Sequence, residues 1–164
     1  MEEFLNITKS FGAIILAIVA SWLAYRHNKL TRELSNDNLQ KQLFTEFNGR
    51  YDHLNDLLRF VMEFSQEEEE LFMAAAENEK FGEFSKSYIK FKINDYFNLC
   101  SEEYYWYSKN RVDTRIWSSW KKGMNDIYSK SLIIQEQWQE EIKNEGWKSF
   151  YLDKPNRLFN NNNI

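Results

Sequence analysis

One carboxylate, Glu103, stands out because its helical surroundings are apolar. A wheel at about 100° per residue gathers one apolar arc from Ile89, Ile93, Tyr96, Phe97, Cys100, Tyr104 and Tyr107, extended by Tyr88, Leu99 and Trp106. Glu103 falls inside the extended arc. A carboxylate in such a place must find a partner or accept a raised pKa. Glu103 is therefore the best candidate for a polar site, either structural or ligand-binding.

Three interpretations of Glu103 remain open from the sequence. Arg111 and Arg115 follow just after the turn that ends this segment, and either could fold back to form a buried ion pair. The carboxylate could instead lie at a partly exposed rim, or it could contact a ligand at a site with a perturbed pKa. Trp106 and Trp117 are the aromatic residues that we expect to border such a site.

The four consecutive rings from Tyr104 to Tyr107 cannot form one stacking surface on a helix, because neighbouring side chains point about 100° apart. Tyr104 and Tyr107 are predicted to face inward, with Trp106 at the border of the core. Tyr105 falls on the opposite, polar side. It is therefore the candidate aromatic residue for a protein partner surface.

Signatures of catalysis are missing from the sequence. It contains no glycine-rich phosphate loop, no paired-cysteine metal motif, no HExxH and no Glu-x-x-His. The single cysteine, Cys100, has no histidine or basic residue nearby to lower its pKa, so we expect a small buried hydrophobe. We therefore expect no catalytic residue, no metal and no cofactor, and predict that the protein is not an enzyme.

Composition predicts an all-α fold. The 164 residues include 17% aromatic residues but only five Gly and one Pro. Aromatic residues supply a core, while the scarcity of Gly and Pro removes the turns that a sandwich or barrel needs. The net charge of −4 argues against a chain that binds nucleic acid by neutralising phosphates.

The segment Phe11–Tyr25 holds 15 residues without a charge, which predicts a membrane anchor. A transmembrane helix needs about 20 mostly apolar residues, so the predicted span runs from about Leu5 to Tyr25. Lys9 can then reach the headgroups at one end, and Trp22 suits the opposite interface. A cleaved signal peptide and a buried core helix remain as alternatives, whereas an amphipathic surface helix is excluded because the segment has no polar face.

The flanks of this segment predict its orientation. The basic side chains that follow it are Arg26, His27, Lys29 and Arg32. Positive flanks stay in the cytoplasm, so we expect the amino terminus outside the cell and the domain that follows in the cytoplasm. Ala13, Ala17 and Ser21 recur every fourth residue and could let two spans pack closely in a homo-oligomer.

The apolar periodicity after the anchor predicts a cytosolic helical bundle with a long first helix. The expected domains are an anchor at 1–25, a helical domain at 26–154 and a disordered Asn-rich tail at 155–164. The expected helices cover 26–64, 65–80, 83–109, 114–127 and 129–146. Ser65 matches a capping box and Asp113 a helix N-cap, whereas the acidic run 67–70 is expected to be a solvated first turn.

The stretch from Tyr96 to Trp120 resembles a pattern in bacterial single-span membrane proteins of unknown function. The matching positions are Asn98, Glu103, Val112, Asp113, Ile116 and Trp117. The resemblance implies an amino-terminal anchor in the bacterial inner (plasma) membrane before a cytosolic helical domain, and it supplies no activity. Such a layout is compatible with a role in bacterial stress or phage defence.

Taken together, these features predict a membrane-tethered module that acts by protein–protein contact. The alternative is a ligand-gated membrane effector, in which the helical domain binds a small molecule and the spans assemble and perturb the membrane. The lipid bilayer and an unidentified protein are the expected partners.

Overall fold

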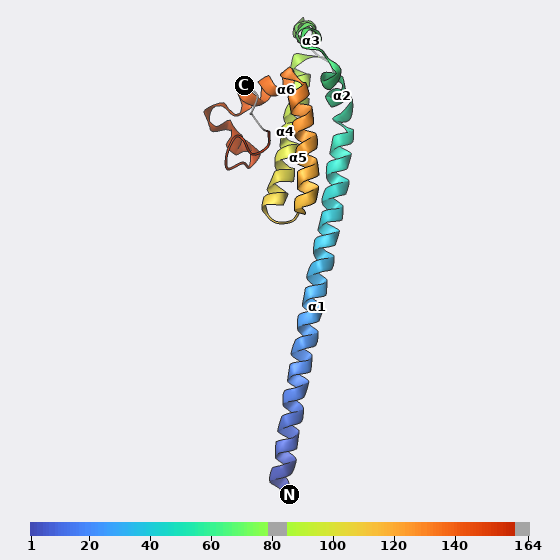
Figure 1. Cartoon of the computed structure of the whole chain (residues 1–164), viewed down its shortest axis with the longest axis vertical. Coiled ribbons are helices and arrows are strands. Elements are labelled where there is room, and N and C mark those ends of the chain that lie inside the picture. The colour runs from blue at the N-terminus through green and yellow to red at the C-terminus, as the bar shows by residue number, and fades with distance from the viewer. Residues whose placement is uncertain (79–84, 160–164) are drawn as a thin grey trace. The chain divides into compact units, whose positions relative to one another are not determined.

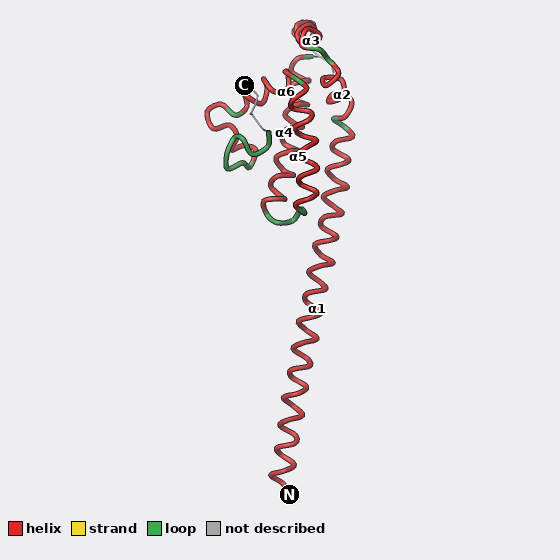
Figure 2. The backbone as a smooth tube through the Cα atoms, viewed as in Figure 1, coloured by secondary structure: helices red, strands yellow, loops and turns green. Residues whose placement is uncertain are grey.

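A computed structural model describes residues 1–78 and 85–159 of the chain. In these ranges every regular element is helical, as Figures 1 and 2 show. The elements are α1 (Glu2–Asp52), α2 (Asn55–Glu63), α3 (Gln66–Asn78), α4 (Lys86–Ser108), α5 (Thr114–Lys130), α6 (Leu132–Glu141) and the 3₁₀ segment η1 (Lys143–Phe150). The all-α prediction is therefore confirmed for the described residues. The chain divides into two units, Met1–Gln42 and Leu43–Ile164.

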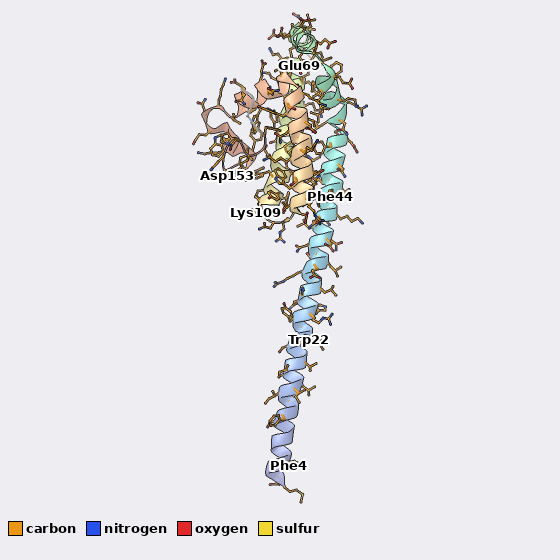
Figure 3. The ribbon with its side chains drawn as sticks, viewed as in Figure 1. Phe4, Trp22, Phe44, Glu69, Lys109 and Asp153 are labelled. Carbon is orange, nitrogen blue, oxygen red and sulfur yellow. The ribbon has the colours of Figure 1, made fainter. Side chains whose placement is uncertain are left out.

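Helix α1 is continuous through the predicted anchor and beyond it. It is long and apolar enough to cross a membrane, by length and composition, and none of its most apolar stretch is buried. Phe11 and Trp22, for example, are 64% and 54% exposed, and Figure 3 shows Phe4 and Trp22 along this helix. A core helix of a soluble protein would bury these side chains. The exposure therefore disfavours that alternative.

The first helix ends earlier than the predicted residue 64. A turn at His53 and Leu54 separates α1 from α2, and the Leu54 amide donates to the Tyr51 carbonyl at 2.9 Å. The weak helix formers at 36–38 and Gly49 remain helical. Leu54 is 4% exposed, so its side chain is buried at this turn, and periodicity alone does not reveal the break.

In the unit Leu43–Ile164, α4 supplies much of the core. Its fully buried residues include Ile89, Ile93, Tyr96, Phe97, Leu99 and Cys100. The helix contacts α3, α5, α6 and η1, and Figure 1 shows α4 and α5 side by side, joined by a short loop. The burial expected for Cys100 is confirmed.

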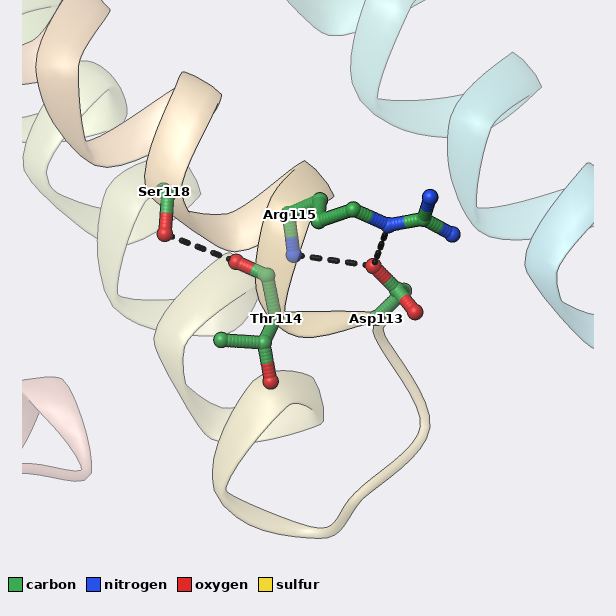
Figure 4. Close-up of polar contacts among 4 residues, drawn as sticks. All are labelled: Asp113, Thr114, Arg115 and Ser118. Carbon is green, nitrogen blue, oxygen red and sulfur yellow. Dashed lines mark hydrogen bonds and ion pairs between the residues drawn. The ribbon is translucent and has the colours of Figure 1, made fainter.

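Local polar contacts explain where several helices begin. The Ser65 hydroxyl accepts the Glu68 amide at 3.3 Å, and the Glu68 carboxylate accepts the Ser65 amide at 2.7 Å, which is the predicted capping box. Asp113 caps α5 by accepting the Arg115 amide at 2.8 Å (Figure 4). Both predicted helix starts are confirmed.

The predicted last helix, 129–146, is wrong in its boundaries. Ser131 adopts an extended backbone and its hydroxyl accepts the Ile134 amide, so α5 stops and α6 starts there. Gly146, the predicted last residue of that helix, lies beyond the end of α6 at Glu141. A Cβ at Gly146 would lie 1.9 Å from the Glu141 carbonyl oxygen, so a close backbone approach requires glycine at this position.

The predicted disordered tail begins too early. Leu158 and Phe159 are fully buried. The Phe159 ring stacks on Tyr128 at 4.6 Å between centroids and meets Trp138 edge-on at 5.1 Å. Apolar burial therefore extends the folded unit through residue 159, while the rest of the predicted tail lies outside the described residues.

Candidate functional site

Glu103 is fully buried on α4. The phenol of Tyr51, in the last turn of α1, donates a hydrogen bond of 3.3 Å to Glu103 Oε2. Glu103 Oε1 has no hydrogen-bond partner among the described residues. The prediction that this carboxyl lies on an apolar face is confirmed, and the rim interpretation is wrong.

Three further titratable groups surround the Glu103 carboxyl. Tyr51 and Tyr96 meet edge-on with 6.5 Å between ring centroids, and the Tyr96 hydroxyl donates to the Met124 carbonyl at 3.3 Å. Cys100 lies one turn before Glu103 and interacts with both phenols. We call Tyr51, Tyr96, Cys100 and Glu103 the Glu103 cluster.

Burial dominates the protonation of the Glu103 cluster. It raises the pKa of Glu103 to about 8, opposed by the hydrogen bond from Tyr51 and the charge of Arg50 and reinforced by the charge of Glu102. Burial also raises the pKa of the Tyr51 and Tyr96 phenols and of the Cys100 thiol. The cluster therefore holds its protons at neutral pH and offers no thiolate nucleophile.

The ion pair expected between Glu103 and Arg111 or Arg115 is not formed among the described side chains. The Arg115 Nε donates to Asp113 at 3.1 Å, and the Arg115 side chain is 93% exposed. Arg111 is also exposed, and its amide closes the turn by donating to the Trp106 carbonyl at 3.0 Å. Asp113 lies two residues from Arg115, so this local partner is reached without burying a guanidinium.

A different arginine lies beside the Glu103 cluster. Arg50 Nη1 donates to Glu102 Oε2 at 2.5 Å, and both side chains are about one-third exposed. The pair joins the end of α1 to α4 next to the Tyr51–Glu103 hydrogen bond. Sequence reasoning missed Arg50 and Tyr51. The one available signal was the place of Tyr51 in the apolar periodicity of the long first helix.

The two candidate tryptophans pack in separate aromatic contacts. Trp117 is buried, and its ring stacks on that of Tyr107 with 5.0 Å between centroids. The Tyr104 ring is a second neighbour of Trp117, at 5.6 Å between centroids. Trp106 is half-buried and meets Tyr105 edge-on at 5.6 Å. These ring contacts assign Trp117 to the packing of α4 against α5.

Tyr105 is exposed, as predicted, with 37% of its surface accessible. The ring of Tyr151, itself 62% exposed, lies 5.9 Å away, and the Lys109 ammonium lies 5.3 Å from the Tyr105 ring centroid. We call Tyr105, Trp106, Lys109 and Tyr151 the aromatic surface. Aromatic residues at an exposed surface are typical of protein interfaces.

One residue of the acidic run is not solvated, contrary to expectation. Glu69, labelled on α3 in Figure 3, is 3% exposed. Its Oε2 accepts the Leu132 amide at 2.8 Å and the Ile133 amide at 3.3 Å. A carboxylate at this position satisfies two unpaired amides at the start of α6 and interacts favourably with the helix dipole. Sequence alone did not single out Glu69 from its acidic neighbours.

Within the described part of the chain, no three His, Cys, Asp or Glu side chains are placed to hold a metal ion. No protein-family model matches the chain, and no curated protein and no solved structure is significantly similar to it.

Proposed function

We propose that the protein is a membrane-tethered interaction module that acts by protein–protein contact. The observation that carries this proposal is the exposure of the apolar stretch Phe11–Tyr25 in a chain whose remaining part forms a helical unit with its own core. A lipid bilayer is the solvent that such a stretch fits. Confinement to a membrane raises the effective concentration of the helical unit for its neighbours.

The proposed orientation places the helical unit in the cytoplasm at the bacterial inner membrane. Arg26, Lys29 and Arg32 follow the apolar stretch, and basic flanks are retained on the cytoplasmic side. Arg26 also lies 5.1 Å from the Trp22 ring centroid, a contact suited to the headgroup region. The resemblance to bacterial single-span proteins implies the same layout, and a role in bacterial stress or phage defence is compatible with that layout.

The aromatic surface is the proposed contact region for the protein partner. Tyr105 and Tyr151 present large rings with few rotatable bonds, which lowers the entropic cost of association. Lys109 adds a charge at the edge of the rings. The surface thus combines an aromatic centre with a polar rim, as in many protein interfaces.

Protease protection tests the tether. We expect the full chain to remain with the membrane after alkaline extraction of bacterial cells. In spheroplasts the helical unit should resist external protease and become cleavable only after permeabilisation. A matched variant with Ile15 and Leu16 both changed to Asp should be released into the soluble fraction. Extraction of the unaltered chain at alkaline pH would refute the anchor.

Photo-crosslinking in living cells tests the partner surface. A photoreactive phenylalanine placed at Tyr105 should yield a discrete protein adduct, whereas the same residue at exposed Ser119 should not. The adduct should also decrease when Tyr151 is changed to Ser. Equal adduct formation at both positions would exclude a specific surface at Tyr105.

A ligand-gated membrane effector is the second candidate function. Ala13, Ala17 and Ser21 are small residues spaced four apart on α1, a pattern that lets spans pack closely. Such an effector should be toxic on expression, and the toxicity should depend on the span. Nontoxic expression with a specific adduct at Tyr105 would favour the interaction module.

A further inference from the structure

The junction of α2 and α3 leaves a group of apolar side chains at the surface of the helical unit. Phe60 is 40% exposed and Leu71 is 71% exposed, while Phe64 and Phe72 are half-buried. The three phenylalanine rings contact one another, with 4.4 to 5.4 Å between centroids. We call Phe60, Phe64, Leu71 and Phe72 the α2–α3 surface, and Figure 1 shows these two helices at one end of the helical unit.

The core of the unit does not use the exposed side of α2. That helix buries Leu58 and Val61, and Phe60 lies about 100° or more from both around the helix. On α3 the buried apolar residue is Ala76, whereas Leu71 remains exposed. A contiguous group of exposed apolar side chains of this kind marks a contact site for another molecule.

Negative charge borders the α2–α3 surface. Four exposed carboxylates lie within one helical turn of its apolar residues, and they are Asp56, Glu63, Glu67 and Glu68. Hydrogen bonds with Ser65 lower the pKa of Glu68, so this carboxylate is charged at neutral pH while it caps α3. Between Asn55 and Asn78 the sequence has seven acidic side chains and one basic side chain, Arg59. The whole chain has a net charge of only −4, so its negative charge is concentrated at this end of the helical unit.

This charge discriminates among the molecules that could cover the surface. The anionic headgroups of a membrane would be repelled by it. A second copy in a two-fold contact would bring two acidic borders together, because such a contact places the same patch of both copies face to face. A segment with basic side chains is attracted instead. The surface therefore fits apolar anchors that are flanked by Lys or Arg.

The spacing of the exposed rings favours a helix as the occupant. Phe60 and Phe64 are four residues apart, and rows of this spacing form the ridges against which a second helix packs. An amphipathic helix offers apolar anchors at the same spacing. We propose that the α2–α3 surface binds a basic amphipathic helix of a partner protein, whose apolar face covers the four residues of the surface and whose Lys or Arg side chains face the bordering carboxylates. This surface is distinct from the aromatic surface, and its binding does not require the membrane tether.

Photo-crosslinking with a defined peptide tests the proposal. The full chain, in nanodiscs of zwitterionic lipid, carries a photoreactive phenylalanine at Phe60. The probe is a capped peptide of two Leu-Lys-Lys-Leu-Leu-Lys-Leu repeats. Phe91 is the matched control position, because it is 59% exposed on α4 and lies between Lys90 and Lys92. We expect a peptide adduct at Phe60 and at most about one-fifth as much adduct at Phe91. A peptide with Glu in place of every Lys should give no adduct at Phe60.

Two sets of variants separate the apolar and the charged contributions. Leu71→Ser removes the most exposed anchor and should raise the peptide concentration for half-maximal adduct by about fivefold or more. Glu63→Gln combined with Glu67→Gln should raise this concentration by about threefold or more, because two charges of the border are lost. Glu46→Gln combined with Glu140→Gln makes the same change of net charge on α1 and α6 and should leave it within about twofold. Helical circular dichroism confirms that each variant is folded.

Several results would overturn the proposal. One is the absence of a peptide adduct both at Phe60 and with the photoreactive residue placed at Leu71. Equal adducts at Phe60 and Phe91, or equal adducts with the Lys and Glu peptides, would also contradict it. Equal effects of the two double variants would reduce the attraction to the overall charge of the protein. An adduct between two copies of the chain without peptide would assign the surface to self-association, and a lipid adduct in nanodiscs with anionic lipid would assign it to the membrane.

Discussion

The Tyr51 phenol lies 3.3 Å from the Glu103 carboxyl although the two residues are 52 positions apart in the chain. This hydrogen bond joins the last turn of α1 to the carboxyl-terminal part of α4 inside the core of the helical unit. It is accompanied at the surface by the Arg50–Glu102 ion pair. One neutral and one charged contact thus fix the same two helices.

Glu103 should make the protein less stable as the pH rises. Its pKa is about 8 in the folded protein and 4.5 in the unfolded chain, so the folded state holds an extra proton between these values. The contribution of Glu103 to the free energy of unfolding is therefore largest below pH 4.5 and is lost progressively up to about pH 8. The free energy of unfolding falls over this range by at most ~1.4 kcal/mol per pH unit. Glu103→Gln should abolish this part of the slope in urea unfolding followed by Trp fluorescence. Glu63→Gln is the control, and identical slopes for Glu103→Gln and the wild type would refute the raised pKa.

Removal of the Tyr51 hydroxyl should destabilise the protein. Tyr51→Phe leaves the buried Glu103 carboxyl without this partner, which costs about 1–3 kcal/mol in the free energy of unfolding. It should also raise the pKa of Glu103 further, because the Tyr51 hydrogen bond lowers it. Denaturant unfolding measures the first effect, and exposed Tyr151→Phe should change stability by less than about 0.5 kcal/mol. Equal stability of the two variants would show that the buried hydrogen bond contributes nothing.

Phe159 should be among the most sensitive positions in the helical unit. It is fully buried against Tyr128 and Trp138, so Phe159→Ala should lower the free energy of unfolding by about 3–5 kcal/mol. Phe91→Ala makes the same change at a residue that is 59% exposed and should cost less than about 0.5 kcal/mol. Chemical denaturation of both variants gives the comparison. A mild effect at Phe159 would contradict its place in the core.

The Asp113 cap should matter through its oxygen acceptor. Asp113→Ala removes the acceptor for the Arg115 amide and should lower the melting temperature. Asp113→Asn keeps an oxygen acceptor and should therefore lower the melting temperature much less. Hydrogen bonds from Arg115 lower the pKa of Asp113 below 3.8. Its charge therefore contributes stability above that pH, and this contribution is lost as the pH falls through the folded-state pKa. The difference in melting temperature between Asp113→Asn and the wild type should shrink as the pH is lowered. A difference that stays constant with pH would show that the Asp113 charge does not contribute to stability.

Small residues on the span should control any self-association. Ala17→Phe places a ring where Ala13, Ala17 and Ser21 would let two helices approach, so it should reduce the signal in a bacterial membrane two-hybrid assay. Val19→Phe, about 200° away around the helix, should retain the signal. An unchanged signal for Ala17→Phe would exclude this packing face.

Features set by local sequence could be predicted well. The Ser65 and Asp113 caps depend on groups two or three residues apart, and the burial of Cys100 follows from the helical period. Glu103 could likewise be placed on a buried face, because the wheel reports which side of a helix is apolar. These properties need no knowledge of which other helix lies opposite.

The partner of Glu103 could not be predicted, because a wheel does not identify the helix that packs against it. Arg111 and Arg115 were the basic candidates that follow Glu103 in sequence, but Asp113 offers Arg115 a partner at lower desolvation cost. The end of α1 at Asp52 was missed for a related reason. Leu54 is buried at the turn that follows, and tertiary packing overrides helix propensity at such positions.

The burial of Phe159 also has a consequence for the order of events during synthesis. Phe97 and Trp138, which contact Phe159, are made by the ribosome well before their aromatic neighbour emerges. Chains fold from the amino-terminal side as they are synthesised, so a nascent helical unit would expose these rings to solvent until residue 159 is free to dock. A chaperone that shields aromatic surface in that interval would protect the newly made protein from aggregation.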